Sequence, residues 1–474
     1  MDQPAGPSPP PPAASPRPRR EPGIALDWIR HRLGNTFRSL RHRNYRLFFV
    51  GQGVSVVGTW VQKIAMGWLV YRLTHDVLML GLVAFCSQIS QLFVPPLAGV
   101  LADRVNRRSI VLVTQTLATV QAFTLGVLAL TGTIQVWHIV ALALWQGLVS
   151  SFDITARQSF VADMIEAKED FGNAIALNSS LFNIARIIGP TIGAGLIAGG
   201  SALAALLGLS AKLPYAGEGI CFIVNAVSFG AVIFALARMD VPRRQANPLP
   251  PRLVLANIRE GFSYALRHPA IGSILLLTAT VSLLATPFVE MLPVFAKNTL
   301  GGDERVYGYL ASAMGVGAFA GAILLASRRR VDGLGKLIVM VVILLGVGLA
   351  VFSRSHKLAL SLPLLVVVGF GMMVRGASAN TLIQTLVDDD KRGRVISIYI
   401  MAQQGVAPFG NLLHGYLARH FGAANVVLAT GLLCLLAAGW FATRVRGVHR
   451  QLHVQQRACP VLAALRDEAV AAAG

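Results

Sequence analysis

The chain has 474 residues, of which 54% are hydrophobic and only 14% are charged. Its mean hydropathy of +0.60 is too high for a soluble protein, whose interior could not bury so many apolar side chains. The composition therefore excludes an ordinary cytosolic enzyme, a disordered protein and a disulfide-rich secreted domain. It favours a chain that spends about half of its length in lipid.

Lys and Arg number 42 and Asp and Glu 22, for a formal charge of +20. In a soluble protein this excess would suggest nucleic acid, whereas in a membrane protein it marks the cytoplasmic loops. With the N-terminus inside, the predicted inner segments hold 32 basic residues, the outer loops 7 and the spans three. We therefore expect both termini in the cytoplasm, the lipid bilayer as a partner, and no nucleic acid.

Segment 1–43 divides into two parts. Its first twenty residues are Pro-rich and lack the apolar core of a signal peptide, so we expect disorder. Residues 24–43 mix apolar side chains with arginines, as in an amphipathic helix on the membrane surface. A soluble cap is the alternative.

Twelve long apolar stretches follow. The chain is therefore predicted to be an all-α membrane protein with twelve transmembrane helices. The predicted spans are 47–71, 79–101, 109–131, 136–155, 172–198, 217–237, 271–296, 306–326, 336–353, 358–380, 395–418 and 423–443.

The spans are predicted to form two six-helix repeats, 44–238 and 271–444, joined by a cytoplasmic linker (239–270) and followed by a cytoplasmic tail (445–474). A shift of 221 residues places Gly172 on Gly393 and Gly189 on Gly410. Two six-span repeats joined by an inner linker are typical of secondary transporters.

The loop between the second and third spans is short and densely charged. It reads Gly99-Val100-Leu101-Ala102-Asp103-Arg104-Val105-Asn106-Arg107-Arg108. The glycine is expected to let two helices approach closely, and the carboxylate to lie near the positive end of a helix dipole. The arginines can pair with acids or lipid phosphates. An arginine-rich inner loop without a specific role is the alternative.

This loop resembles the signature loop of the major facilitator superfamily, G-x-L-A-D-R-x-G-R-R. Asn106 replaces a glycine there, a mild change because Asn tolerates left-handed turns. Other stretches resemble the enterobactin-exporter-like secretion transporters of that superfamily, and the resemblance runs from Asn44 to Arg444. These stretches are Gly58-Thr59-Trp60-Val61-Gln62, Gly67-Trp68-Leu69-Val70, Phe152 to Val161, Arg259-Glu260-Gly261-Phe262, Arg267-His268-Pro269 and Arg392-Gly393-Arg394-Val395-Ile396-Ser397.

The resemblance implies the major facilitator fold, alternating access, and a central cavity lined by spans one, four, seven and ten. It also implies a conformational-switch loop made of Gly99, Asp103, Arg104, Arg107 and Arg108. Asp103 is expected to hold the inner side shut by pairing near Arg392 or Arg394, at the start of span eleven.

Span five contains Ala176, Ala185, Gly189, Pro190 and Gly193. The spacing resembles the antiporter motif of efflux members, with alanine in its first two places. Small residues allow close packing and the proline kinks the helix, which can help seal one conformation. The resemblance favours export, and ordinary small-residue packing is the alternative.

Charged residues inside the spans are costly in lipid unless they are paired or hydrated. Lys63, Glu290 and Arg375 lie in spans one, seven and ten, and Asp153 lies at the inner end of span four. These four are the candidates for proton coupling or gating, with structural ion pairs as the alternative. Lys63 and Glu290 share a predicted depth and are expected to form a closing pair. Arg186, beside the span-five motif, is expected to be structural.

Several motifs are missing from the sequence. The efflux-type arginine of span four would fall at Ala143. No G-x-x-x-x-G-K-[ST] loop, H-E-x-x-H or paired-cysteine motif occurs, so we expect no cofactor, no bound metal and no catalytic residues.

We therefore interpret the chain as a transporter of the bacterial inner (plasma) membrane, expected to be a monomer, that exports a small amphipathic molecule by proton antiport. Uptake or facilitated diffusion, and a membrane scaffold or sensor that does not transport, are the alternatives.

Overall fold

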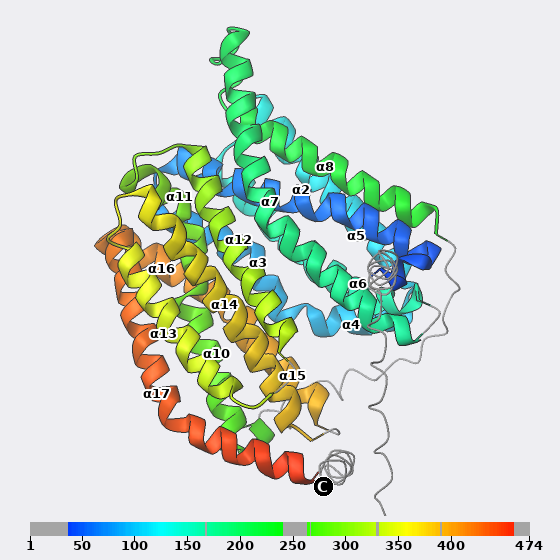
Figure 1. Cartoon of the computed structure of the whole chain (residues 1–474). Coiled ribbons are helices and arrows are strands. Elements are labelled where there is room, and N and C mark those ends of the chain that lie inside the picture. The colour runs from blue at the N-terminus through cyan, green and yellow to red at the C-terminus, as the bar shows by residue number, and fades with distance from the viewer. Residues whose placement is uncertain are drawn as a thin grey trace, which may run out of the picture.

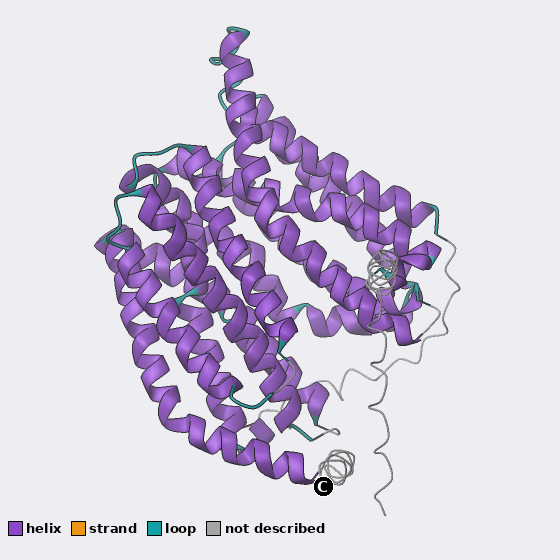
Figure 2. Cartoon of the chain, viewed as in Figure 1, coloured by secondary structure: helices purple, strands orange, loops and turns teal. Residues whose placement is uncertain are grey.

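The computed structural model describes residues 37–165, 168–239, 263–265, 267–328, 331–388 and 391–458, with a few side chains within these ranges left aside. Figure 2 shows these residues as helices and loops, without a strand. The predicted Pro-rich tail, most of the predicted amphipathic helix, most of linker 239–270 and residues 459–474 lie outside the described residues.

The described helices fall into two sets along the chain. The first set is η1 (Arg38–Arg41), α2 (Arg43–Thr74), α3 (Val77–Phe93), α4 (Pro95–Arg104), α5 (Arg107–Leu130), α6 (Val136–Asp163), η2 (Lys168–Asp170), α7 (Phe171–Leu206) and α8 (Ala216–Ala237). The second set is α10 (Pro269–Leu284), η3 (Thr286–Met291), α11 (Leu292–Val294), η4 (Phe295–Thr299), α12 (Glu304–Ser327), α13 (Leu334–Phe352), α14 (Leu358–Leu386), α15 (Arg392–Ile400), η5 (Met401–Gly405), α16 (Ala407–Phe421) and α17 (Ala423–Ala458).

Nine helical stretches in the described part are long and apolar enough to cross a membrane. The other three predicted spans coincide with α2, with α3 and α4, and with α15 to α16. The α3–α4 segment is divided where Pro95 begins a new helix, and a π-helical turn separates α15 from α16. A count of twelve transmembrane helices therefore stays a prediction.

Aspartates define the start of two helices on the side where α2 ends. The Asp76 carboxylate accepts a hydrogen bond from the Leu78 amide (2.9 Å) at the start of α3. Asp303 accepts from the amides of Arg305 (3.0 Å) and Val306 (3.3 Å) at the start of α12. Such caps satisfy amides that have no partner within the helix, so they fix where each short loop ends.

The helices pack as two groups that meet along one interface (Figure 1). In the first group α8 packs on α2 and α5, and α6 packs on α3 and α5; in the second, α14 packs on α12 and α13, and α17 on α10 and α13. The interface is formed by α7 with α12 and by α3 with α16. We call these groups the first and second halves; the exact domain boundaries stay predictions.

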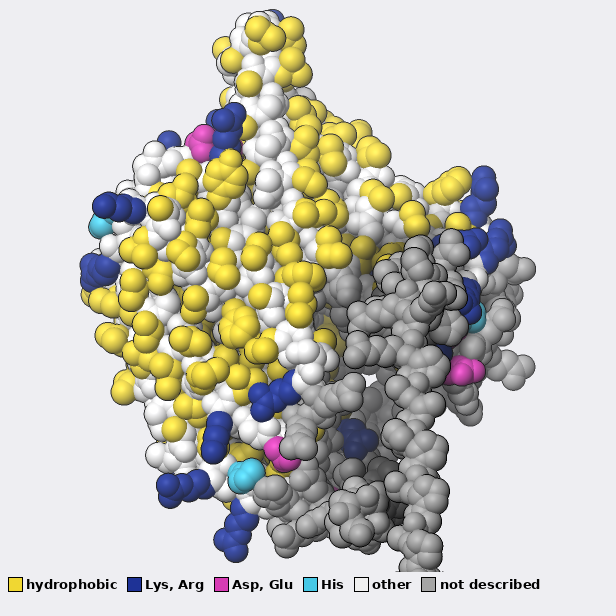
Figure 3. Space-filling model, viewed as in Figure 1, with side chains coloured by type: hydrophobic (Ala, Val, Ile, Leu, Met, Phe, Trp, Pro, Cys, Tyr) yellow, Lys and Arg dark blue, Asp and Glu magenta, His cyan; other side chains and the backbone are white. Residues whose placement is uncertain are grey.

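The surface separates apolar from charged side chains. Figure 3 shows hydrophobic side chains across the middle of the visible face, over α7, α12, α13 and α14, with the visible Lys and Arg side chains near its ends. Large apolar residues of α12, α13 and α14 are well exposed, among them Ile323, Met340 and Leu360 at 55%, 51% and 48%. An apolar face of this kind is stable in a bilayer rather than in water.

The 221-residue repeat relates two tight helix contacts. A Cβ on Gly189 of α7 would lie 2.4 Å from the Trp60 Cβ of α2, and a Cβ on Gly410 of α16 would lie 2.3 Å from the Leu283 oxygen of α10. Under the same shift, α2 corresponds to α10 and α7 to the α15–α16 segment. The glycine pair thus makes equivalent close contacts in the two halves.

Candidate functional site

A cavity of about 540 Å³ lies between the two halves. Its wall includes residues from all four predicted lining spans, represented by Lys63, Gln146, Glu290 and Met372. Residues of α3, α5, α7, α8, α12 and α16 also contribute, so the wall is broader than the sequence analysis expected. A cavity of this volume accommodates a drug-sized molecule.

Span seven is not a continuous helix beside this cavity. After α10 ends at Leu284, the chain forms the 3₁₀-helix η3, the short α11 and the π-helix η4. Pro287 and Pro293 lack the amide hydrogens that a continuous helix requires, which explains the break. Glu290 therefore projects into the cavity from a 3₁₀ turn between two prolines.

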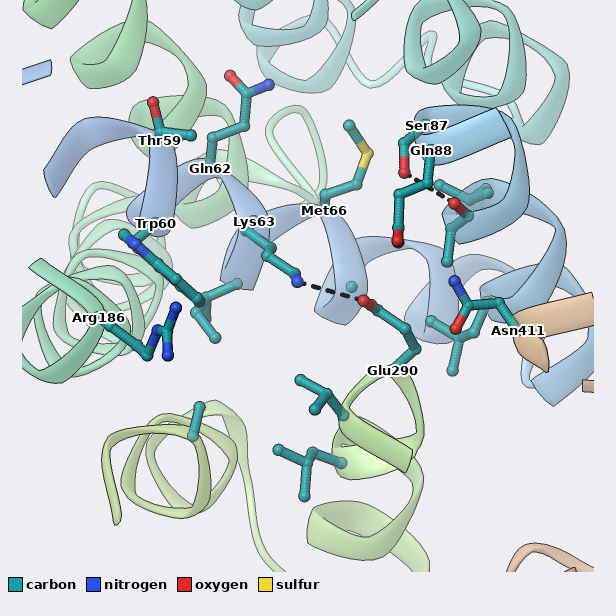
Figure 4. A pocket seen from close by; sticks show the side chains of 18 of the residues that line it. Thr59, Trp60, Gln62, Lys63, Met66, Ser87, Gln88, Arg186, Glu290 and Asn411 are labelled. Carbon is teal, nitrogen blue, oxygen red and sulfur yellow. Dashed lines mark hydrogen bonds and ion pairs between the residues drawn. The ribbon is translucent and has the colours of Figure 1, made fainter. Parts of the chain in front are cut away.

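Lys63 and Glu290 form an ion pair across the two halves. The Lys63 Nζ of α2 lies 3.2 Å from the Glu290 Oε1 of η3, as Figure 4 shows. The side chains are 44% and 20% exposed, so the pair lies in the cavity wall rather than in a sealed core. The structure thus brings together the two residues that the sequence analysis expected to pair.

Three further contacts join the halves near the same end of α2. The rings of Trp68 and Tyr307 stack with their centres 6.2 Å apart, and the Tyr71 hydroxyl donates a hydrogen bond to the Asn298 Oδ1 (2.6 Å). Asp76, which caps α3, lies 3.4 Å from Arg419 of α16. Together with the Lys63–Glu290 pair, these contacts hold the two halves together on the side that the charge distribution predicts to be outside.

Arg186 of α7 also lies in the cavity wall. Its guanidinium carbon is 5.7 Å from the centre of the Trp60 ring, and Figure 4 shows the two side chains together. Its Nε has no hydrogen-bond partner within the described part of the chain. The sequence analysis expected a structural residue here, yet the side chain faces the cavity.

A cluster of amide side chains forms another part of the wall. The Gln62 Nε2 donates to the Gln121 Oε1 (3.2 Å), and the Asn225 Nδ2 donates to the Gln62 Oε1 (2.8 Å). A Cβ on Gly58 would lie 2.6 Å from the Asn225 Oδ1, so this glycine allows α8 to approach α2. Sequence reasoning named only Gln62 of this cluster, because residues from three separate helices meet only in the folded protein.

Arg375 and Asp153 do not join the Lys63–Glu290 pair. Arg375 is 3% exposed within the second half and is not among the cavity residues. Asp153 accepts hydrogen bonds from the Thr114 hydroxyl and the Gln115 amide, both at 2.9 Å, and pairs with Arg157. The structure therefore brings together only two of the four candidates, and a coupling or gating role for Arg375 and Asp153 stays a prediction. The spans were correctly assigned to the cavity, but these side chains point into helix–helix contacts.

The charged loop is only partly described, because the side chains of Asp103 and Arg104 lie outside the described residues. The Arg107 Nη1 lies 3.1 Å from the Asp163 Oδ2 at the end of α6. Arg108 donates to the carbonyl oxygens of Leu236 (2.9 Å) and Ala237 (3.2 Å), at the negative end of α8. The expected pairing of Asp103 with Arg392 or Arg394 stays a prediction.

Two details of this loop differ from expectation. A Cβ on Gly99 would meet no atom of the described residues within 4 Å, so the expected close approach of helices is not found there among them. Asn106 has φ −57°, and its side chain accepts a hydrogen bond from the Arg108 amide (3.0 Å). It acts as the cap of α5 rather than as a left-handed turn residue.

The antiporter-like motif lies where α7 contacts both α2 and the second half. Gly189 packs on Trp60, and a Cβ on Gly193 would lie 3.3 Å from the Val61 backbone. On the opposite side, a Cβ on Gly308 of α12 would lie 3.1 Å from the Pro190 oxygen. The motif therefore gives tight packing in the interface between the halves; its role in sealing stays a prediction.

The fold and the cavity define the class of the protein. Two helical halves around a central cavity lined by both apolar and polar side chains, with apolar side chains on the outer surface, are the architecture of a major facilitator superfamily transporter. Residues 34–457 match the family described as transmembrane secretion effector, so the chain belongs to that family. It is a multi-pass protein of the cell membrane.

Three relatives of described function are transporters rather than enzymes. The Staphyloferrin A transporter of Staphylococcus aureus (strain NCTC 8325 / PS 47) is 23% identical over 84% of this chain and 96% of that protein. The multidrug efflux pump Tap of Mycolicibacterium fortuitum is 27% identical over 80% and 90%. The enterobactin exporter EntS of Escherichia coli O1:K1 / APEC is 23% identical over 76% and 81%.

Solved structures support the fold. A bacterial homologue of the human lysosomal transporter Spinster, inward-facing and unoccupied, superposes with a TM-score of 0.67 at 14% identity, covering 86% of this chain and 98% of that chain. A POT family transporter in complex with 5-aminolevulinic acid gives a TM-score of 0.64 at 9% identity, covering 86% and 96%.

Proposed function

We propose that the protein exports a small amphipathic molecule by proton antiport, with alternating access to the cavity between the halves. The observation that carries the proposal is the Lys63–Glu290 ion pair, which bridges the two halves in the cavity wall. A carboxylate that both closes a contact and can take up a proton is suited to couple proton entry to a change of conformation.

The conformation described is proposed to be inward-open. The Lys63–Glu290, Trp68–Tyr307 and Tyr71–Asn298 contacts all join the halves near the end of α2, on the predicted outer side. A proton that reaches Glu290 from outside would neutralise the carboxylate and remove its attraction to Lys63. The outer contact would then weaken, and the halves could rock to the outward-open state.

Export is favoured over uptake by two observations. The glycine–proline motif of α7, which resembles the antiporter motif of efflux members, packs tightly in the interface between the halves. The relatives named above include an efflux pump and an enterobactin exporter.

The decisive experiment replaces Glu290 by Gln, which mimics the protonated carboxyl. A deletion strain is first screened against toxic compounds and secreted metabolites to identify a transported compound. Its accumulation is then measured in everted membrane vesicles with an imposed pH gradient. We expect Glu290→Gln to abolish the pH dependence of transport while the protein remains folded.

Glu304→Gln is the matched control, because Glu304 lies in the first turn of α12 and outside the cavity wall. It should retain the wild-type pH profile. If Glu290→Gln also transports with the wild-type profile, the coupling role is wrong. The pair would then be a structural contact, provided that Lys63→Ala still lowers the melting temperature.

A further inference from the structure

The cavity wall carries an unbalanced positive charge. Its charged residues within the described part of the chain are Lys63, Arg186 and Glu290. Glu290 is paired with Lys63, and no carboxylate in that part lies within ion-pair distance of Arg186. One cation, Arg186, therefore faces the cavity without a counter-charge from the described residues.

Packing around α7 holds Arg186 in this position. Gly189, one turn further along α7, brings the helix against Trp60 of α2, and the Arg186 guanidinium lies over that ring. On the other side, a Cβ on Gly315 of α12 would lie 2.8 Å from the Arg186 carbonyl oxygen, so the backbone is closely packed as well. Two helix contacts therefore fix the backbone from which the guanidinium projects.

Both cations of the wall share one aromatic ring. The Lys63 Nζ is 5.5 Å from the centre of the Trp60 ring, and the Arg186 carbon is 5.7 Å from it. Figure 4 shows Trp60 between Arg186 and Lys63, with Glu290 on the far side of the lysine. The ring face stabilises the cations only partly, and it leaves the in-plane donors of the guanidinium available.

We propose that Arg186 and Trp60 form a subsite for the carboxylate of an anionic amphipathic substrate. This inference rests on the proposed function in taking the cavity as the substrate site. The planar guanidinium matches a carboxylate in geometry, and binding it would neutralise the excess charge of the wall. The Trp60 ring would contact the apolar body of the substrate.

The ion pair limits this subsite to one anionic group. While Glu290 is paired with Lys63, Arg186 is the cation of the wall that has no counter-charge among the described residues. Neutralising Glu290 would leave Lys63 as a second cation beside the same ring. Carboxylate binding should therefore become tighter, and the binding of an uncharged analogue should not.

A pair of fluorescent probes tests the proposal without any transport assay. N-dansylglycine carries a carboxylate, and N-dansylglycinamide is an uncharged molecule of nearly the same size and shape. Binding to the purified full-length protein is followed by dansyl fluorescence at neutral pH. We expect the wild type to bind the acid about tenfold more tightly than the amide, the effect of one charge-assisted contact.

Four variants make the test specific. Arg186→Gln should lose the preference for the acid and keep its affinity for the amide, whereas Arg186→Lys should keep part of the preference. Glu290→Gln should increase the preference. Asn183→Ala is the matched control, because Asn183 lies on α7 one turn before Arg186 and outside the cavity wall, and it should leave the preference unchanged.

Several results would overturn the subsite. They are equal binding of acid and amide by the wild type, no binding of either probe up to its solubility limit, or an unchanged preference in Arg186→Gln. If Arg186→Gln does not fold, the other variants decide. The subsite is overturned if Arg186→Lys keeps the full wild-type preference for the acid and Glu290→Gln does not increase that preference. An acid preference can be present even if Glu290 has no part in proton coupling, so failure of the subsite and failure of antiport are distinguishable.

Discussion

The two halves share a packing scheme and differ in the chemistry they bring to the cavity. In the first half, α2 is one helix of 32 residues that carries Lys63, and α7 adds Arg186. In the second half, the segment equivalent to α2 is divided at Pro287 and Pro293, and it carries Glu290. Cations therefore come from a continuous helix scaffold, and the carboxylate comes from a broken segment.

This difference assigns separate roles to the continuous helices and to the broken segment. A continuous helix holds its side chains at a fixed spacing, whereas a segment with missing backbone hydrogen bonds changes shape at lower cost. Separating the halves also separates the two members of the ion pair. The comparison therefore points to the broken segment as the part that responds when Glu290 changes charge.

The largest expected effect concerns the orientation of the two halves in the membrane. Both halves should place their linker side in the cytoplasm, since the positive-inside distribution predicts it. A single cysteine at Ala246 should resist an impermeant thiol reagent in intact cells, and one at Gly302 should react fully. The reverse labelling pattern would mean that Lys63 and Glu290 meet on the inner side, and the proposed proton path would fail.

The charged loop of the first half provides the next test. Its counterpart in the second half, 321–330, has Leu325 where the first half has Asp103, so only one half can use a carboxylate there. We expect Asp103→Asn to slow transport about tenfold or more, the effect of ~1.5 kcal/mol from one charge-assisted hydrogen bond. Substrate affinity and expression should be near normal.

The control for this variant is Glu169→Gln, which removes an exposed carboxylate on the predicted inner side. Turnover is compared with an identified substrate in vesicles. Unchanged turnover in Asp103→Asn would remove the switching role, and equal slowing in both variants would indicate a general effect of inner-side charge.

Substitutions at the glycine pairs of the repeat have the smallest expected effects, and they test the shared packing directly. Gly189→Ala and Gly410→Ala would each place a methyl group 2.4 Å or less from an atom of the neighbouring helix, and each should cost about 1–3 kcal/mol. A Cβ on Gly172 or Gly393 would meet no described atom within 4 Å, so Gly172→Ala and Gly393→Ala should change stability by less than about 0.5 kcal/mol. Heat unfolding of the purified variants measures both pairs. A large loss of stability in only one of the two variants Gly189→Ala and Gly410→Ala would show that the halves do not share this contact.

The sequence by itself determined the membrane class, the family and the central ion pair. Long apolar runs and the placement of Lys and Arg follow from the cost of burying charge in lipid, and they are read without coordinates. Lys63 and Glu290 were placed at one depth by counting residues along two helices that run in the same direction. Depth is a one-dimensional property, so a sequence can give it.

Only the tertiary structure decided which way each charged side chain faces. Arg186 faces the cavity because Gly189 and Gly315 set the position of α7 between α2 and α12. Arg375 and Asp153, on spans that line the cavity, point into helix contacts instead. Rotation about a helix axis depends on how small residues let neighbouring helices approach, and that depends on partners distant in the sequence.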